Sequence, residues 1–388
     1  MFKSKKFLIT SIFILVFCCG MVSLLLGSIL PDLSETYKFS AAFGGTLLLI
    51  YSSGNLISGL SFGFISLKYG RKAAITLLSV LMSVAIFLFT VDVDSSLFLM
   101  CVCLLMGFGR GGAISFCSGF MNLLTDGNPV AQGVLQSMFA FGAVSSPLIF
   151  VCARNISGWR TGLLIMALIA VVPVILLLLS DFDHNAPEPE GKTAHDDKFG
   201  FFRERGFFAI SFSMFFYLCC EYSINGWLVT YLENKNMPSD FAQSMAALLW
   251  FVMFIGRVIC SVVSKFISQR MLMLILSFGS TICFAVMLIV SGMTPITLTV
   301  IFTGLFLSGI SSVIYTLAAP YSNKYPMAIG FIFSIGTSGA MLMPFLTGVL
   351  SEFYGFNGGM AAILITFVML DILSLMNYRR LSKIESAS

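Results

Sequence analysis

Twelve apolar segments follow one another along this chain of 388 residues, and their lengths constrain the fold more than any other feature. Each is long enough to cross the hydrocarbon core of a bilayer as a helix, which takes about 20 residues. A chain crosses lipid only as helices or as a closed barrel, because all its backbone polar groups must be satisfied internally, and runs of this length fit helices. Hydrophobic residues make up 58% of the chain and charged residues 10%, which excludes a soluble globular protein.

The sequence therefore predicts an all-α membrane protein with twelve transmembrane helices. The predicted spans lie at about residues 7–30, 41–66, 73–91, 96–121, 130–153, 161–180, 206–232, 241–263, 271–293, 296–320, 327–350 and 356–376.

One polar stretch interrupts this pattern between the sixth and seventh spans. Residues 181–205 carry mixed charges together with Pro187 and Pro189, a composition typical of a linker. The predicted organisation is a six-helix bundle at 1–180, the cytoplasmic linker, and a second six-helix bundle at 206–388. When the chain is shifted by 197 residues without gaps, the stretch from Gly107 to Gly162 aligns with the stretch from Gly304 to Gly359 with twelve identities across 56 positions, and eight of these are Gly or Pro. Shared hydrophobicity alone would not place helix breakers in register, so we interpret the halves as the parallel repeat of a rocking transporter.

Lys and Arg residues are distributed unevenly between the two ends of the predicted spans. With the N-terminus inside, sixteen of them lie in cytoplasmic segments and four in external loops. The positive-inside rule then places both termini and the linker in the cytoplasm, in a multi-pass protein of the plasma (inner) membrane. The first apolar run follows three lysines but shows no small-residue cleavage pattern, so we interpret it as a retained helix and not as a signal peptide.

Two charged residues lie deep inside predicted spans. Glu221 is near the middle of the apolar run at 206–232, where an ionised carboxylate costs several kcal/mol unless it faces protein, water or a partner charge. Arg110 lies among glycines in the fourth span, and its guanidinium has the geometry to bind a carboxylate or phosphate at two points. The alternative is a structural arginine that pairs with Glu221 or with helix carbonyls. For Arg257 and Asp371, nearer the predicted cytoplasmic ends of their spans, a structural role is favoured over substrate binding.

The loop after the second span carries a recognisable pattern. Gly63, Lys68, Gly70, Arg71 and Lys72 match the signature loop of the major facilitator superfamily, which this loop resembles. Leu67 replaces the acidic residue of that signature, which puts a charge-relay role for the loop in doubt. The resemblance implies two six-helix bundles that alternate access to a central site, with this loop contributing to gating. A simple basic turn on the cytoplasmic side is the alternative interpretation.

Within that superfamily the chain most resembles the fucose permease-like branch of sugar:proton symporters. The resemblance rests on the seventh-span pattern from Glu221 through Trp227 to Leu232, and on Gly256-Arg257 in the eighth span. That branch carries coupling carboxylates in its first and fourth helices, whereas here the first span has no acid before Asp32 and the fourth carries Arg110. Sugar specificity therefore does not transfer directly.

These considerations give a set of candidate site residues. Glu221 is also the candidate for proton coupling. The predicted substrate-binding residues are Arg110, Gln136, Glu221, Asn225, Trp227 and Tyr315.

The predicted function is secondary active transport of a small polar solute, a sugar or organic anion, by alternating access. Symport with protons is the candidate form of coupling, and multidrug/proton efflux is the alternative. A non-transporting receptor is disfavoured because the chain has no large soluble extension. An enzyme is disfavoured because no Walker loop, nucleophile elbow or HExxH pattern occurs.

No cofactor, metal ion or nucleic acid is expected as a partner of this protein, and a monomer in the lipid bilayer is predicted. The ten cysteines lie almost entirely within apolar runs, where they act as small hydrophobic side chains. The two histidines, His184 and His195, lie in the linker and have no metal-ligand spacing.

Overall fold

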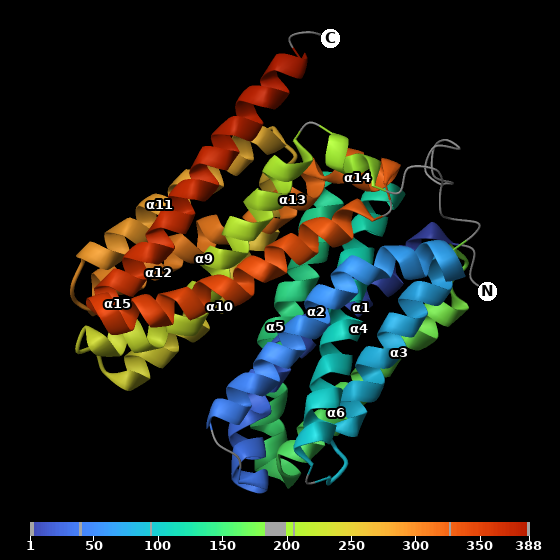
Figure 1. The fold of residues 1–388 in the computed structure, drawn as a ribbon, viewed down its shortest axis with the longest axis horizontal. Helices are drawn as coiled ribbons and strands as arrows, with labels where there is room; N and C mark the ends of the chain where they lie inside the picture. The colour runs from blue at the N-terminus through green and yellow to red at the C-terminus, as the bar shows by residue number, and fades with distance from the viewer. Residues whose placement is uncertain are drawn as a thin grey trace. The chain divides into compact units, whose positions relative to one another are not determined.

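The computed structural model describes residues 4–38, 41–93, 95–182, 199–204, 206–325 and 327–385. Within these ranges the chain is built of helices, as predicted (Figure 1). Eleven helical segments are long and apolar enough to cross a membrane, and the last of them extends over 52 residues. Most of the predicted linker at 181–205, together with both histidines, lies outside the described residues.

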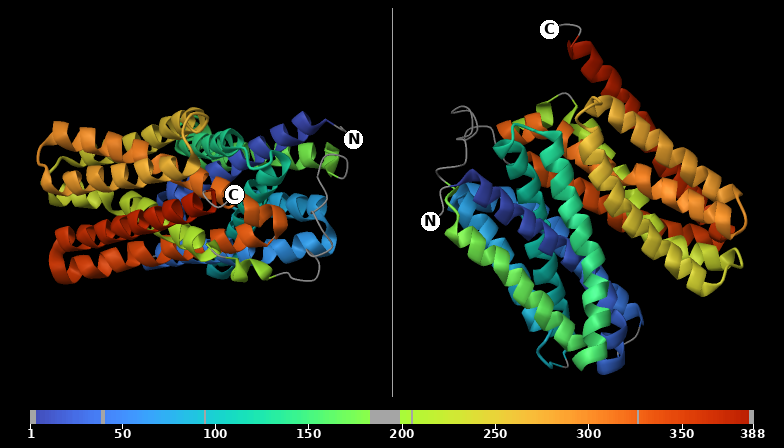
Figure 2. Two further views of the ribbon diagram at one scale, coloured as in Figure 1. Left: turned by 90° about the horizontal axis from the view of Figure 1, so that it is seen from above. Right: turned by 180° about the vertical axis from the view of Figure 1, so that it is seen from behind.

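The described chain forms two compact units. The first contains residues 1–126, 138–199 and 321–334, and the second contains residues 127–137, 200–320 and 335–388. Most of each predicted six-helix bundle falls within one unit, but the first turns of the fifth span belong to the second unit. Figures 1 and 2 show the helices of each unit from three directions.

The first unit is built from six long helices. Within it α2 and α3 both pack against α4, and α6 packs against α1 and α3. Glycines with positive φ mark two of the helix starts, Gly70 before α3 and Gly158 before α6, where a left-handed backbone favours Gly over other residues. The helices are α1 (Lys5–Tyr37), α2 (Ala41–Tyr69), α3 (Arg71–Leu88), α4 (Ser96–Leu124), α5 (Pro129–Ser157) and α6 (Trp159–Leu179).

Besides the first turns of α5, the second unit contains a short 3-10 helix, η1 (Gly200–Arg203), followed by long helices. Within it α10 packs against α9 and α12, and α11 packs against α12 and α13. The helices are α9 (Phe207–Asn234), α10 (Ser239–Val263), α11 (Gln269–Ile289), α12 (Met293–Ser308), α13 (Ile310–Leu317) and α15 (Ala328–Glu385). The short α14 (Ala319–Lys324) follows α13, and residues 321–334, which include most of α14 and the first turns of α15, belong to the first unit.

Three of the predicted spans differ from single separate helices. The predicted span at 296–320 is divided into α12, α13 and α14, with the first interruption at Gly309. In contrast, the last two predicted spans are joined as α15, which is non-helical at Gly355, where φ is 71°. That glycine divides α15 into two stretches that are each long enough to span a bilayer, in agreement with the twelve predicted crossings.

Candidate functional site

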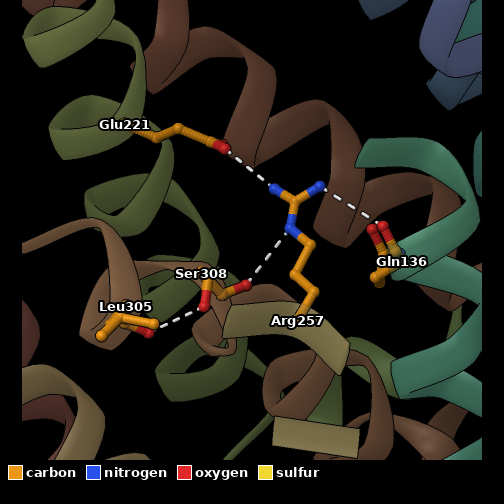
Figure 3. A network of polar contacts seen from close by, with 5 residues as sticks. All are labelled: Gln136, Glu221, Arg257, Leu305 and Ser308. Atoms are coloured by element: carbon orange, nitrogen blue, oxygen red, sulfur yellow. Dashed lines mark hydrogen bonds and ion pairs between the residues drawn. The ribbon is translucent and has the colours of Figure 1, made fainter. Parts of the chain in front are cut away.

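Helix α9 positions Glu221 inside the second unit. The helix is apolar along almost its whole length, so insertion in the membrane and packing determine its position. The side chain of Glu221 is buried, and its Oε1 atom lies 3.0 Å from Nη2 of Arg257 on α10 (Figure 3). The carboxylate that the sequence places in mid-membrane is therefore neutralised by a cation from a neighbouring helix.

Arg257 is only 2% exposed and uses all three of its nitrogen positions. Besides the contact with Glu221, its Nε donates to the carbonyl of Ser308 at 3.3 Å and its Nη1 donates to the carbonyl of Gln136 at 3.4 Å. Figure 3 shows the guanidinium between these three acceptors. We call Glu221, Arg257, Ser308 and Gln136 the Glu221–Arg257 network.

Small residues allow α10 to approach the α12–α13 junction closely enough to form this network. A Cβ atom added to Gly256 would clash with the Ser308 hydroxyl, and one added to Gly309 would clash with the thiol of Cys260. Gly309 is also where α12 ends and α13 begins. At this interruption the Ser308 carbonyl accepts a hydrogen bond from Arg257.

Other buried polar atoms in the second unit make no hydrogen bond to any described residue. The hydroxyl of Tyr217, one helical turn before Glu221, lies near Ser311 and the Glu221 carboxylate. Buried polar groups are normally hydrogen-bonded, and leaving one unsatisfied costs about 1–3 kcal/mol. These atoms are therefore candidates for contact with a polar solute or water. They are Tyr217 Oη, Ser223 Oγ, Ser311 Oγ, Ser312 Oγ, Thr303 Oγ1 and Gln136 Nε2.

Arg110 lies on α4 in the first unit and is 5% exposed. Its Nη1 donates to Asn55 Oδ1 at 2.8 Å, and its Nε donates to the carbonyl of Cys19 at 3.1 Å. The guanidinium also lies 5.9 Å from the ring centroid of Tyr51 and 5.4 Å from that of Phe139. An amide, a backbone carbonyl and two π-faces thus hold this buried cation.

The glycines around Arg110 act as the sequence predicts. A Cβ on Gly107 would clash with the backbone of Tyr51, and one on Gly111 would lie 2.6 Å from Cα of Asn55. The backbones of α2 and α4 can therefore approach closely, which brings the Asn55 amide within reach of Arg110.

The other predicted site residues have different surroundings. Asn225 is half-buried on α9, and Tyr315 is buried on α13. The indole Nε1 of Trp227 donates to the carbonyl of Pro344 on α15 at 2.9 Å, and its ring packs against Phe356. This hydrogen bond joins α9 to α15, so Trp227 has a structural function in addition to its predicted one.

The signature loop forms a tight basic turn between α2 and α3. Gly70 has φ of 86°, and Lys72 Nζ donates to the carbonyls of Leu178 and Ser180 at the end of α6, at 2.8 and 2.9 Å. The Arg71 guanidinium lies 5.8 Å from the ring centroid of Phe120. A Cβ on Gly63 would lie 2.6 Å from the side chain of Met327, so the loop's first glycine is a close-packing position.

Reasoning from the sequence did not predict that Arg257 pairs with Glu221. It favoured a structural role in which the side chain extends toward the cytoplasmic surface. The structure instead places it inside the protein against Glu221. Two features of the sequence are consistent with a buried position for this arginine, although neither identifies its partner. Arg257 lies within an otherwise apolar run, and its neighbour Gly256 is a residue type that permits close helix packing.

The described helices, with a buried ion pair and unsatisfied hydroxyls in their interior, form a multi-pass membrane protein with a polar interior site. The chain matches the family model of the Major Facilitator Superfamily over residues 12–319, and it belongs to that family. This is a family of transporters and not of enzymes, as the sequence predicts.

Two relatives and one solved structure show how far the similarity extends. The sialic acid transporter NanX of Escherichia coli (strain K12) is 24% identical over 377 residues, covering 91% of this chain and 88% of the relative. The glucose/mannose transporter GlcP of Bacillus subtilis (strain 168) is 23% identical over 348 residues, covering 86% and 85%. The crystal structure of the E. coli fucose:proton symporter FucP superposes with a TM-score of 0.79 at 15% identity, covering 96% of this chain and 99% of that one. The predicted resemblance to the fucose permease is therefore found at the level of the fold.

Proposed function

We propose that this protein is a secondary active transporter that moves a small polar solute, a sugar or an organic anion, by alternating access. The proposal rests on the buried ion pair of the Glu221–Arg257 network, together with the unsatisfied hydroxyls of the same unit, in a chain built to span lipid. Intramembrane ionisable residues are costly, and they usually mark a substrate or ion pathway.

The chemistry of the unsatisfied groups suits a hydroxylated solute. Tyr217, Ser311 and Ser312 offer hydroxyls that both donate and accept, and Gln136 offers an amide N–H. Sugars and hydroxy acids present the complementary pattern. The names of the relatives, which transport sialic acid or glucose and mannose, are consistent with this class of substrate.

Proton coupling through Glu221 is the second part of the proposal. While Arg257 lies 3.0 Å away, the carboxylate is stabilised in its ionised form. A step of the transport cycle that separates the two groups would leave a buried carboxylate without its cation, and taking up a proton then removes the cost of the charge. Such a group binds a proton in one state and releases it in another, which symport requires.

The experiment begins with ligand identification. The purified full-length protein is screened by thermal unfolding against neutral sugars, acidic sugars, organic acids and amphiphilic cations, because a ligand that binds the folded state raises its melting temperature. We expect stabilisation by a sugar or organic acid. Stabilisation only by amphiphilic cations would contradict the proposal and favour drug efflux.

Transport in proteoliposomes then tests the coupling. We expect Glu221→Gln, which mimics the protonated carboxyl, to abolish accumulation driven by a pH gradient and to keep counterflow exchange. Glu233→Gln, at the exposed end of the same helix, is the matched control and should preserve both activities. Uphill transport that survives in Glu221→Gln would rule out coupling through this residue.

Arg110 is proposed to bind an anionic group of the solute. Arg110→Lys keeps the charge but removes the forked geometry, so we expect weaker binding of an acidic substrate. Unchanged binding in Arg110→Ala, with lower thermal stability, would assign Arg110 a structural function only.

The proposed setting is the plasma membrane, with both termini in the cytoplasm and a monomer as the working unit. Single cysteines introduced at Thr193 and Asn236, in a background without native cysteines, should label from opposite sides of the membrane. Labelling of both positions from outside would contradict this topology.

A further inference from the structure

A groove lies at the start of α3, on the first unit, away from the buried network. It has a volume of about 540 Å³ and is lined by the turn from Tyr69 to Ala73, by the next turns of α3 and by Leu178 of α6. None of the residues that line the groove is among the predicted substrate-binding residues. Three of them, Gly70, Arg71 and Lys72, belong to the signature loop.

One end of the groove is positively charged. Arg71 and Lys72 both line it, and Lys72 is fixed in place by its hydrogen bonds to the carbonyls of Leu178 and Ser180. A further cation, Lys68, lies one residue before this turn. One acidic residue, Asp181, directly follows Ser180, whose carbonyl accepts from Lys72. Cations therefore outnumber carboxylates here, and the replacement of the family's acidic residue by Leu67 contributes to that excess.

The groove also contains a hydroxyl without a protein partner. Thr76 Oγ1 is buried and makes no hydrogen bond to any described residue. Thr76 lies one turn after Lys72 on α3, so the two side chains share a face of the helix. The amino end of α3 adds a positive dipole at the same place.

The other end of the groove is apolar and faces outward. Leu77 of α3 is 45% exposed and Leu178 of α6 is 53% exposed, with Val80 one turn further along α3. In a membrane such exposed aliphatic side chains contact lipid chains. The groove thus passes from a cationic, hydroxyl-bearing end to an apolar stripe, which is the polarity of a phospholipid.

We propose that this groove, which we call the α3–α6 groove, binds one anionic glycerophospholipid of the leaflet on the cytoplasmic side. The phosphate lies between Arg71, Lys72 and the Thr76 hydroxyl, and an acyl chain lies along Leu77, Val80 and Leu178. Basic pockets between transmembrane helices on the cytoplasmic side are suited to such headgroups, and the positive-inside rule predicts that side for this loop. This lipid site shares Gly70, Arg71 and Lys72 with the predicted gating loop, but it does not depend on the identity of the solute.

Lipid retention by the purified full-length protein tests the proposal. The protein is delipidated in a neutral detergent, titrated with dioleoylphosphatidylglycerol or dioleoylphosphatidylcholine, and examined by native mass spectrometry. We expect preferential retention of one phosphatidylglycerol. Removing one cation in Arg71→Gln should weaken that binding about fivefold, and Thr76→Val should weaken it further, whereas Lys265→Gln, an exposed charge on the other unit, should leave it unchanged.

A steric variant keeps the test independent of charge and folding. Ala73→Trp fills the groove from an exposed position on α3 and should abolish retention, whereas Leu168→Trp on the exposed face of α6 should not.

Equal retention in the wild type and in Ala73→Trp would overturn the proposal. Equal retention of phosphatidylcholine would overturn its anionic selectivity. Displacement by excess inorganic phosphate would show a site for soluble anions and not for a lipid. The experiment measures lipid retention and not solute transport. Its result therefore stands even if the proposed transport function is wrong.

Discussion

Arg110 and Arg257 are both buried, one in each unit, and they differ in the groups that stabilise the charge. Arg257 faces a carboxylate at 3.0 Å and two backbone carbonyls. Arg110 faces the amide oxygen of Asn55, a backbone carbonyl and two aromatic rings. In a buried ion pair, removing either partner leaves the other as an uncompensated buried charge. When neutral dipoles stabilise a buried charge, several groups each contribute part of the stabilisation.

This difference predicts different chemistry at the two sites. The charge of Arg257 is balanced by Glu221, so a proton can change the balance by neutralising the carboxylate. In its described contacts Arg110 is held by uncharged groups, so no single proton controls these contacts. The proposed proton coupling at Glu221 and the proposed anion recognition at Arg110 would differ in this way, and the following variants test how strongly each cation depends on its partners.

The largest expected effect comes from separating the buried ion pair. Arg257→Met leaves Glu221 as a buried carboxylate without its cation, which typically costs about 3–5 kcal/mol. The double variant Arg257→Met/Glu221→Leu should recover most of that stability, because a buried pair is often replaced by apolar groups at little net cost. Thermal and denaturant unfolding in detergent measures both. A double variant that is as unstable as the single one would show that the remaining contacts of Arg257, and not its charge pairing, hold the network together.

A smaller loss is expected for Arg110. Arg110→Met leaves the acceptors on Asn55 and Cys19 without this donor, and an unsatisfied buried acceptor costs about 1–3 kcal/mol. Adding Asn55→Leu removes one of those acceptors and should recover part of the stability. A loss as large as that of Arg257→Met in the same unfolding measurement would contradict the distinction between charged and neutral partners.

Much of this fold could be predicted from the sequence because bilayer thickness determines helix length. The predicted spans agree with the helices to within a few residues at most ends. The main exceptions are α1, which continues to Tyr37 although its apolar run ends near residue 30, and α15, which continues to Glu385 although the last predicted span ends at about residue 376. Hydropathy detects the part of a helix that contacts lipid, and a helix can extend beyond the membrane into water or headgroups.

The pairing of side chains across helices could not be predicted in the same way. Spacing along α9 indicates which residues share a face with Glu221, but not which neighbouring helix covers that face. That the partner is Arg257 depends on the close approach of α10, and this depends on Gly256 and on the interruption of the tenth span at Gly309. The backbone of Gly309 has φ of −84° and ψ of −14°, which are close to helical values and which residues other than glycine also adopt. The glycine at this position therefore does not by itself predict that the helix is interrupted there.

Gly309 provides the next test, since it positions Arg257 without bearing a charge. Gly309→Ala places a Cβ against Cys260 and Leu276, and overpacking of this kind costs about 1–3 kcal/mol. Gly226→Ala on α9 is the matched control, because no atom lies within 4 Å of the added Cβ and alanine favours a helix by about 0.5–1 kcal/mol. Opposite shifts in melting temperature are expected. Equal shifts would show that the close approach of α10 does not constrain the network.

The smallest effect is expected for an ion pair that is close but exposed. Arg160 Nη2 lies 2.6 Å from Asp92 Oδ1, but the two side chains are 37% and 66% exposed, and water and salt screen their attraction. The hydrogen bond from Arg160 lowers the pKa of Asp92. This contact therefore stabilises the protein above the unfolded pKa of about 3.9, and its contribution is lost as the pH falls through the lowered native pKa.

Asp92→Asn keeps an oxygen that accepts from Arg160 and from the Tyr37 hydroxyl. We therefore expect a barely measurable change in melting temperature at neutral pH, smaller still at high salt. A loss comparable to that of Arg257→Met would show that short distance, and not burial, determines what an ion pair contributes in this protein.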